Sequence, residues 1–359
     1  MHGKKRVLIV GGYGMVGKAI SEILSKDEKI SLTISGRNSF KAKNLAEKLG
    51  THWITVDIAD KQSISSALVN TDIVINCFSG PFTHSPLTLP ELALKRGIHY
   101  LDVAGSYEYA ERFLKLNAQA VENKTILITA LGANPGIPGI VLMSIKDEFD
   151  KIDSCKIYFI MGSSFEEISV SSLKELKYMF DVEPLVWEQS QWSKPSTKSI
   201  KEYVGKPFEK EIYMGLSLTR DLLVIPKLVQ TNHISFWSGA QNTLQGLILL
   251  TGLKIGMTKN NNLAHLLLKL LKNAGNGKNA VADSLLKVEV TGEKEGIKNT
   301  KIFEMYCEEI YATAIAPSIV CQQIIEEKIT KFGAFVPPEI VPAKEFVDRL
   351  KTFEIHFSF

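Results

Sequence analysis

Cysteine is scarce in this chain, and its few cysteines are widely spaced. Cys77, Cys155, Cys307 and Cys321 form no C-x-x-C pair within the 359 residues. Disulfide frameworks and zinc sites usually contain closely spaced cysteines, so the pattern predicts free thiols, a reducing compartment and a cytoplasmic protein. The seven histidines show no H-x-x-x-H spacing, so we expect no metal site.

The chain also lacks long hydrophobic runs and a strong charge of either sign. The longest apolar passage, residues 244–257, contains Gln245 and Lys254 and is too short to span a bilayer. We expect a buried or partly interfacial helix there and no membrane anchor. The first ten residues, "MHGKKRVLIV", run directly into a strand pattern and leave no room for a signal peptide. A net charge of +3, spread along the chain, argues against nucleic acid as the main partner.

The stretch "VLIVGGYGMVGKAI", residues 7–20, fits two nucleotide-binding loops. Gly12, Gly14 and Gly17 match the G-x-G-x-x-G turn that follows a first strand and precedes a helix in dinucleotide-binding folds. Gly12, Gly17 and Lys18 also match a nucleoside triphosphate loop, but Ala19 replaces the Ser or Thr that binds magnesium. The dinucleotide interpretation is therefore favoured. In it Gly12 makes the tight turn, Gly14 admits a pyrophosphate and Gly17 allows close packing of the helix on the strand.

The first part of the chain alternates strands and helices. We predict strands at residues 7–10, 31–35, 52–56, 73–76, 100–103 and 126–129, and helices at 18–25, 41–49, 62–69, 89–96 and 108–122. Short apolar strands separated by helices are typical of a parallel sheet covered on both faces, which is the doubly wound α/β (Rossmann) architecture.

After "ALGANPGIPG" this rhythm ends, and a chain of 359 residues exceeds one comfortable core. Long alternating segments, such as "LLKVEVTGEKEG" and "KIFEMYCEEI" with Gly292 and Gly296, favour a hairpin-rich antiparallel sheet. We predict a dinucleotide-binding domain of residues 1–133 plus 311–359. An inserted α+β domain of residues 134–310 would serve the substrate or dimerisation, and the helical tail would dock back on the first domain.

The end of the second predicted strand indicates which dinucleotide binds. NAD-specific folds place a carboxylate there for the ribose 2′-hydroxyl, but no Asp or Glu occurs between Lys29 and Ala46. Arg37 follows Ser35 instead, and a guanidinium suits a 2′-phosphate, so NADP is preferred over NAD. A solvated surface arginine is the alternative. Asp57 would lie beside the adenine, or belong to a helix cap near Asp60.

Two further strand ends are candidates for the nicotinamide and substrate. In "NCFSGPF", residues 79–81 would form a tight turn close to the nicotinamide ribose. In "HYLDVAG", Tyr100 and Asp102 share one face of their strand, which suits orienting a substrate amine or donating a proton. A buried Tyr–Asp hydrogen bond that holds the strand end is an equally weighted alternative. His233 is expected to be structural.

Together these segments, with "ALKRGIHYLDVAGS", "ALGANPGIPGI" and the tail "GAFVPPEIVPAKEFVDRLKTF", resemble the saccharopine dehydrogenase-like family of NADP-binding oxidoreductases. The resemblance covers about the first 145 residues and the tail. It implies a Rossmann domain, an inserted α+β domain that often forms a homodimer interface, and Tyr100 and Asp102 facing the substrate. It also implies that Gly136 lies beside a helix start able to hold a carboxylate. The cofactor contacts that it implies are Gly12, Tyr13, Gly14, Met15, Val16, Ser35, Arg37, Asp57, Ile58, Cys77, Phe78, Ser79 and Gly80.

Three functions remain open at this point. The leading one is NADP-dependent hydride transfer to or from an imine or amine carbon of a small molecule, because family members of known activity mostly interconvert C–N bonds. The middle domain has no evident basic cluster for saccharopine itself. A carbonyl or enoyl reductase with an apolar pocket lined by residues 244–256 is the second. The third is a non-catalytic NADP-binding sensor or scaffold that uses the apolar segment to hold a protein or a membrane surface.

Overall fold

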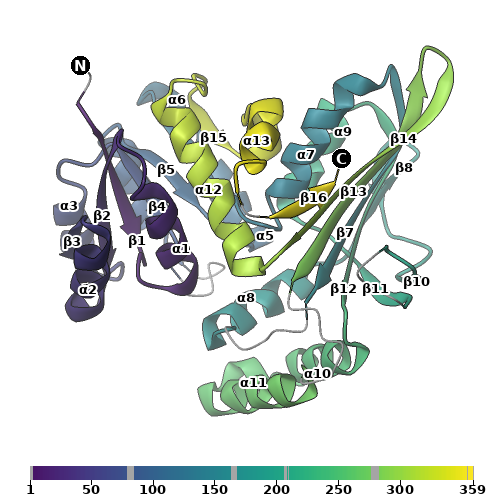
Figure 1. Ribbon diagram of the computed structural model, residues 1–359, viewed down its shortest axis with the longest axis horizontal. Coiled ribbons are helices and arrows are strands. Elements are labelled where there is room, and N and C mark those ends of the chain that lie inside the picture. Colours follow the sequence, from purple (N-terminus) through teal and green to yellow (C-terminus); the bar gives the residue numbers. More distant parts are fainter. Residues whose placement is uncertain are drawn as a thin grey trace. The chain divides into compact units, whose positions relative to one another are not determined.

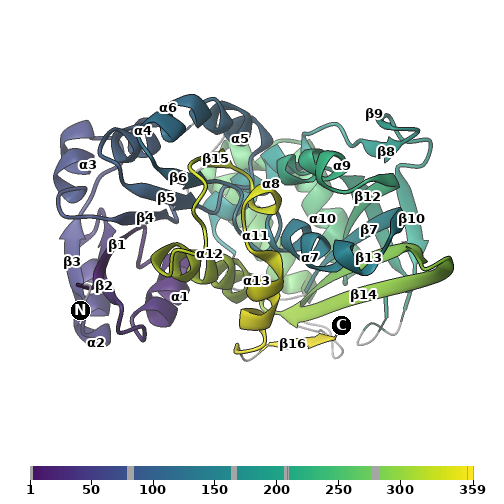
Figure 2. The same ribbon diagram turned by 90° about the horizontal axis from the view of Figure 1, so that it is seen from above.

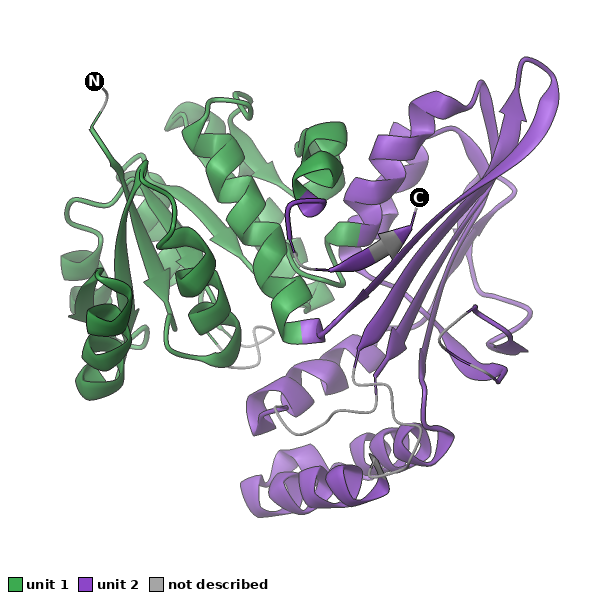
Figure 3. Ribbon diagram, in the orientation of Figure 1, with its two compact units in different colours: residues 1–137, 310–349 green, residues 138–309, 350–359 purple. Residues whose placement is uncertain are grey.

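The chain divides into two compact units in a computed structural model that describes residues 3–78, 85–162, 168–205, 208, 210–275, 283–353 and 355–358. Unit 1 contains residues 1–137 and 310–349, and unit 2 contains residues 138–309 and 350–359 (Figure 3). The first boundary lies four residues after the predicted one. Residues 350–359 were predicted to belong to the first domain, together with residues 311–349. They belong to unit 2 instead.

The described residues of unit 1 form a parallel sheet of seven strands in the order β15-β6-β5-β4-β1-β2-β3 (Figure 1). Its strands are β1 (Lys5–Val10), β2 (Ile30–Gly36), β3 (His52–Thr55), β4 (Ile73–Asn76), β5 (His99–Asp102), β6 (Ile126–Ile128) and β15 (Gly333–Phe335). Sequential strands run outward from β1 to β3 and then continue on the other side from β4. The strand order therefore reverses between β1 and β4, where ligands bind in open α/β sheets.

Helices cover both faces of this sheet (Figure 2). One face packs into a core with α3 (Lys61–Ala67), α4 (Thr88–Lys95), α5 (Tyr107–Leu114) and α6 (Asn117–Glu122). The other face carries α1 (Met15–Leu24), α2 (Ser39–Leu49) and α12 (Glu309–Ile325). The predicted helix 108–122 is thus two helices. Strands β4 and β6 are short and buried along their whole length, which explains why they appear in the sequence as apolar runs.

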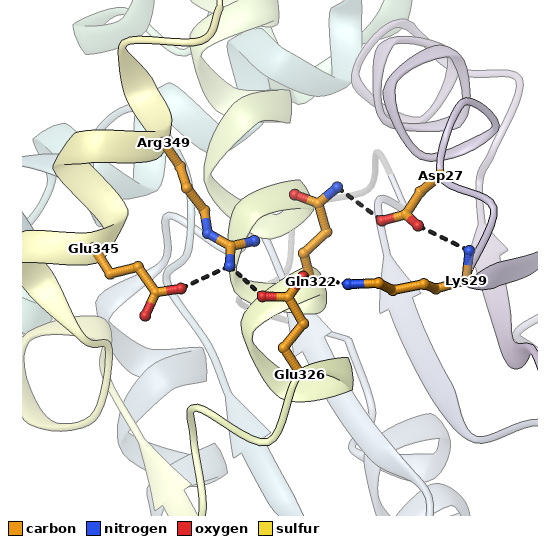
Figure 4. Close-up of polar contacts among 6 residues, drawn as sticks. All are labelled: Asp27, Lys29, Gln322, Glu326, Glu345 and Arg349. Atoms are coloured by element: carbon orange, nitrogen blue, oxygen red, sulfur yellow. Dashed lines mark hydrogen bonds and ion pairs between the residues drawn. The ribbon is translucent and has the colours of Figure 1, made fainter. Parts of the chain in front are cut away.

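The C-terminal return to unit 1 is held by a polar network (Figure 4). Glu326, the residue that follows α12, accepts from Lys29 at 2.9 Å and from Arg349 on α13 (Ala343–Leu350). Gln322 Nε2 donates to Asp27 Oδ2 at 3.0 Å, and Arg349 also bonds Glu345 at 2.6 Å. The docking of the tail is confirmed, and β15, which the sequence analysis missed, adds a strand to the edge of the sheet.

Unit 2 has a mixed sheet with nine strands among the described residues. Its main order is β10-β11-β12-β7-β13-β14-β16, and β8 pairs with β12 and β9. The strands are β7 (Lys151–Met161), β8 (Val186–Glu188), β9 (Gln191–Ser193), β10 (Ser199–Glu202), β11 (Ile212–Ser217), β12 (Thr231–Ala240), β13 (Ser284–Lys294), β14 (Ile297–Cys307) and β16 (His356–Ser358). The predicted β13–β14 hairpin is confirmed, but the sheet is not purely antiparallel, because β7 and β12 run parallel.

The helices of unit 2 are α7 (Ile137–Ile145), α8 (Val170–Phe180), α9 (Ile225–Leu228), α10 (Thr243–Lys254) and α11 (Asn261–Gly275). Short 3-10 turns occur at Lys146–Glu148, Arg220–Val224 and Met257–Lys259, and a fourth, Pro337–Glu339, lies in unit 1. Within the described ranges no helix is both long and apolar enough to cross a membrane. The four cysteines are buried and form no disulfide among these residues.

Candidate functional site

The loop between β1 and α1 is fixed by the ends of the two strands beside β1. The Gly12 amide donates to the Ser35 carbonyl and the Cys77 amide donates to the Val10 carbonyl, both at 2.8 Å. Gly11 has a φ of +77°, and a Cβ atom there would lie 2.9 Å from the Cys77 carbonyl oxygen. Only glycine fits this position. The loop backbone is therefore rigid at the point where the strand order reverses.

The structural roles of the glycines in the loop differ in part from the predicted ones. The left-handed turn is at Gly11, which the motif does not include, and not at Gly12. A Cβ on Gly12 would lie 3.0 Å from the Ile34 side chain, so Gly12 is required for packing against β2. A Cβ on Gly17 would lie 2.2 Å from the Gly11 carbonyl oxygen. The predicted packing role of Gly17 is confirmed.

The start of α1 points three backbone amides at the space above this loop. Gly14 is the N-cap residue and has no side chain to bond the first helical amides, those of Met15, Val16 and Gly17. Such amides lack an intrahelical acceptor and carry the positive end of the helix dipole. Met15 and Val16 are only partly buried. The loop and helix start therefore fit an anion of the size of a pyrophosphate.

The end of β2 brings together Tyr13, Gly36, Arg37 and Asn38. The Tyr13 hydroxyl accepts from the Asn38 amide at 2.8 Å, and its ring covers Gly36 so closely that a Cβ there would lie 2.4 Å from the ring. Asn38 also caps α2 by accepting from the Lys41 amide at 3.0 Å. Arg37 is exposed and makes no ion pair within the described residues. Its guanidinium is therefore available to an anionic group at the loop.

The side chain of Ser35 was predicted to contact the cofactor, but it is not exposed to one. Its side chain is completely buried, and its hydroxyl donates to the Ile9 carbonyl at 2.9 Å. This hydroxyl group therefore joins β2 to β1 inside the protein and does not face a ligand. Gly36 and Asn38, which the sequence analysis did not select, occupy that strand end instead.

Asp57 and Ile58 follow β3 in a turn. Asp57 Oδ1 accepts from the Ala59 amide at 3.0 Å, while Asp60 caps α3 by accepting from the Gln62 amide at 2.8 Å. The helix cap is thus Asp60, and Asp57 stabilises its own turn. Ile58 packs against the core of this face. Both are partly buried at the carboxyl edge of the sheet, and their contact with an adenine stays a prediction.

After β4, Cys77 is buried and Phe78 is half-buried. The Phe78 amide donates to Asn76 Oδ1 at 3.1 Å, which turns the chain at the strand end. Burial raises the pKa of the Cys77 thiol, so this sulfur is not a nucleophile. Ser79, Gly80 and Pro81 lie outside the described residues.

Tyr100 and Asp102 form the centre of a buried polar cluster. Tyr109 donates to Asp102 Oδ2 at 3.1 Å, and Thr129 donates to Asp102 Oδ1 at 2.7 Å. The Tyr100 hydroxyl accepts from Asn76 Nδ2 at 2.9 Å and lies 3.4 Å from the Tyr109 hydroxyl. Both Tyr100 and Asp102 have no exposed surface. This burial contradicts the prediction that they face a substrate. A buried Tyr–Asp hydrogen bond does hold the strand end, as the alternative supposed, but its donor is Tyr109 and not Tyr100.

The electrostatics of this cluster agree with a structural role. Burial raises the pKa of Asp102 to about 6, although hydrogen bonds from Thr129, the Ala104 amide and Tyr109 partly oppose the rise. Burial also raises the pKa of Tyr100 and of Tyr109 well above the usual value. A carboxyl that accepts bonds from three groups and lies away from solvent joins β5, β6 and α5.

The turn at residues 132–137 is closed by its own backbone. Gly136 has a φ of +123°, and a Cβ there would lie 2.6 Å from the Gly132 carbonyl oxygen. The Ile137 amide donates to that same carbonyl at 3.1 Å. One of the amides expected to hold a carboxylate is therefore already used, and carboxylate binding there stays a prediction.

Comparison with known proteins agrees with the geometry of unit 1. Residues 7–128 match the family described as "Saccharopine dehydrogenase NADP binding domain". A curated relative, saccharopine dehydrogenase [NADP(+), L-glutamate-forming] of Saccharomyces cerevisiae, is 24% identical over 144 residues. This match spans 40% of the present chain and 31% of the yeast protein.

Solved structures extend the likeness of the fold to both units. The apo form of saccharopine dehydrogenase (L-Glu forming) from Saccharomyces cerevisiae has a TM-score of 0.71 and 14% identity, and covers 99% of each chain. DAP dehydrogenase of C. glutamicum in complex with DAP has a TM-score of 0.50 and 14% identity, and covers 98% of this chain and 100% of that one. The α/β sheet and the mixed second sheet are thus those of the saccharopine dehydrogenase fold. Residues 7–128 belong to the saccharopine dehydrogenase NADP-binding domain family, and the chain is a distant homologue of the yeast enzyme.

Proposed function

We propose that this protein is an NADP-dependent oxidoreductase that transfers a hydride to or from the carbon of an imine or amine in a small molecule. The observation that carries the proposal is Arg37, an exposed guanidinium at the end of β2 beside the glycine loop. No acidic residue occupies this strand end or the following helix as far as Ala46. A dianionic 2′-phosphate is favoured at such a place, and the bare 2′-hydroxyl of NAD gains nothing from it.

Each part of the loop fits a part of the dinucleotide. The backbone amides of Met15, Val16 and Gly17 suit the pyrophosphate. Arg37 and Asn38, which are exposed after β2, suit the 2′-phosphate. The turn after Asn76 lies on the other side of β1, where the nicotinamide half would run in a fold of this type. Bound NADP supplies the hydride chemistry, and the chain contributes binding and orientation.

The C–N substrate class rests on the family resemblance and on the names of the similar proteins. These proteins are a saccharopine dehydrogenase and a DAP dehydrogenase that binds DAP. The buried Tyr100–Asp102 cluster supplies no group that touches a substrate, so its role is to hold the end of β5 beside the site.

The apolar-substrate alternative is less well supported by unit 2. Leu249 and Leu253 of the apolar segment are buried in the core, whereas Leu244, Leu247 and Leu250 are about half exposed or more. The segment is therefore divided between core and surface among the described residues, and does not gather its leucines around a pocket.

The cofactor proposal is tested by reversing one charge. We expect Arg37→Glu to weaken NADPH binding by about 30-fold or more, because a charge-assisted partner is replaced by a like charge. NADH affinity should change much less. Lys48→Glu is the matched control, since Lys48 lies in the last turn of α2, about 14 Å of helix rise from the start of that helix. Equal NADPH affinity in Arg37→Glu and the unaltered protein, measured by fluorescence titration, would refute the proposal.

Turnover separates the enzyme from a non-catalytic NADP-binding sensor. With tight NADPH binding established, loss of absorbance at the NADPH band is followed with a panel of imines formed from amines and oxo acids, and with simple carbonyl compounds. Oxidation of NADPH by an imine supports the proposed reaction. Tight binding without turnover of any member would favour the sensor.

A further inference from the structure

Helices α10 and α11 form an antiparallel hairpin in unit 2. Gln245 Nε2 near the start of α10 donates to the Leu271 carbonyl near the end of α11, and Asn242 Nδ2 donates to the Ala274 carbonyl, both at 2.9 Å. Farther along, Leu267 fills the space where Gly252 has no side chain. The two helices are thus locked together, and Figure 1 shows them side by side.

The leucines of this hairpin point in two directions. Leu249, Leu253, Leu267 and Leu271 are buried between the helices and the rest of the unit. A second set lies at the surface at spacings of three to five residues within each helix and its C-terminal cap, and we name it the leucine face. Its members and their exposed fractions are Leu244 (56%), Leu247 (63%), Leu250 (49%), Ile255 (70%), Leu263 (45%), Leu266 (47%) and Leu270 (42%). Among the described residues, every leucine this exposed lies on this hairpin. Such a concentration exceeds the scattered apolar side chains of an ordinary surface.

The hairpin segment itself carries charge of one sign. No Asp or Glu occurs from residue 222 to residue 282, a stretch that holds six lysines. Four of these lysines, Lys254, Lys259, Lys269 and Lys272, are exposed on the hairpin itself. The chain as a whole has nearly equal numbers of acidic and basic residues, so the absence of carboxylates here is local.

The composition of the face distinguishes among occupants. A second copy of the chain would place lysines against lysines with no carboxylate on the hairpin to pair them. Protein interfaces are rich in aromatic residues and Arg and poor in Lys, and residues 243–275 contain no Phe, Tyr, Trp or Arg. Aliphatic side chains beside long, flexible lysines are the pattern of helices that lie in a lipid interface, where lysine stems reach up to anionic headgroups.

We propose that the α10–α11 hairpin docks on the surface of a membrane that contains anionic lipids. The leucine face enters the boundary between headgroups and acyl chains, and the four lysines contact lipid phosphates and carboxylates. The contact is peripheral, because both helices also bury a second row of leucines in the protein. It is independent of the proposed hydride transfer, since none of its residues belongs to the glycine loop.

The experiment is co-sedimentation of the full-length protein with vesicles. One set is phosphatidylcholine alone, and the other contains about one third phosphatidylglycerol. We expect binding to the anionic vesicles that weakens with added salt, because each lysine near an anionic surface contributes about fivefold to partitioning. Lys254→Gln with Lys269→Gln should lower partitioning by about 25-fold. Leu247→Gln with Leu266→Gln should lower it by about 100-fold, at about tenfold for each lost leucine.

Matched controls come from the surface of the β13–β14 hairpin. Ile297→Gln removes an isoleucine that is 71% exposed, and Lys298→Gln removes a nearby exposed lysine. Both should sediment like the unaltered protein, and all variants should keep its melting temperature and NADPH affinity. Absence of vesicle binding by the unaltered protein overturns the proposal. So does equal binding by the leucine variant, or a dimer in light scattering that the leucine variant abolishes while vesicles never bind.

Discussion

The central strand β4 of unit 1 is buried on both faces, whereas β14 of unit 2 is buried at one end only. All four residues of β4 are buried, while β14 begins with four exposed residues and becomes buried near Cys307. Around β4, backbone and polar groups therefore contact one another inside the protein, whereas the side chains at the start of β14 face water. The comparison teaches that substitutions of the same type should cost more in unit 1. Two pairs of variants below test this directly, and two further measurements test one feature of each unit.

The largest difference is expected from two Gly→Ala substitutions. In Gly17→Ala the new Cβ would lie 2.2 Å from the Gly11 carbonyl oxygen, whereas at Gly215 on β11 the nearest atom is 4.0 Å away. Gly17→Ala should lower the free energy of unfolding by about 3 kcal/mol through overpacking, and Gly215→Ala should leave it within about 0.5 kcal/mol. Urea denaturation measures both. A similar cost for the two variants would contradict the comparison.

The second effect is a pH dependence that originates at Asp102. Burial disfavours its carboxylate, so its pKa is about 6 in the folded protein, against an ordinary value of 3.8 for an aspartate side chain in water. The folded state therefore holds this proton longer than the unfolded state. The stabilisation is complete below pH 3.8 and is lost as the pH rises through 6. From about pH 4 to about pH 7 the unaltered protein should lose about 2–3 kcal/mol relative to Asp102→Asn. A stability difference between the two proteins that does not vary with pH would show that Asp102 does not titrate in this way.

The third effect compares two cation–carboxylate pairs. Arg349, with 23% of its side chain exposed, bonds both Glu326 and Glu345, whereas Lys294 is 47% exposed and pairs with Asp150. Arg349→Met should cost about 1–2 kcal/mol, whereas Lys294→Met should change the stability much less, because water screens the exposed pair. Thermal unfolding of the two variants gives the values. An equal shift in melting temperature would show that the half-buried network contributes no more than a surface pair.

The smallest effect is a gain in the hairpin turn. Glu295 and Gly296 form the two-residue connection between β13 and β14, with φ angles of 50° and 76°. Asn adopts a positive φ more readily than Glu, so Glu295→Asn should stabilise unit 2 by about 0.5 kcal/mol. Glu293→Asn, at the neighbouring strand end, provides the control for loss of a carboxylate. A loss of stability in Glu295→Asn beyond that of the control would indicate that the side chain of Glu295, and not its backbone, matters.

Much of unit 1 was predictable because its signals are local. The strand at residues 73–76 was predicted to the residue, and the others to within two residues at each end. Each needs only an apolar run between a helix and a turn. The mixed pairing of unit 2 was not predictable in this way, because β7 and β12 meet across about 70 intervening residues and no short pattern records their direction.

The candidate site shows the same division at the level of single residues. Arg37 and the glycine loop were found from spacing, since the dinucleotide turn and the following strand end are close in sequence. Gly11 was missed because the atom that excludes a Cβ there is the Cys77 carbonyl oxygen, which is far away in the chain. Tyr100 and Asp102 were assigned to the correct face of β5. Strand alternation could not reveal that α5 brings Tyr109 over that face and seals it from solvent.

By itself the sequence determined the doubly wound first unit, its glycine loop and the absence of a carboxylate at the end of β2. These properties follow from side-chain type and from periods of two to four residues, which local backbone geometry imposes. Only the tertiary structure decided that Ser35 and Asp102 face the interior and that β16 joins the second sheet. It also decided that the leucines of residues 244–270 divide into a buried row and an exposed face. These outcomes depend on which distant segments exclude water from a side chain, and that is a property of the packed chain and not of any one segment.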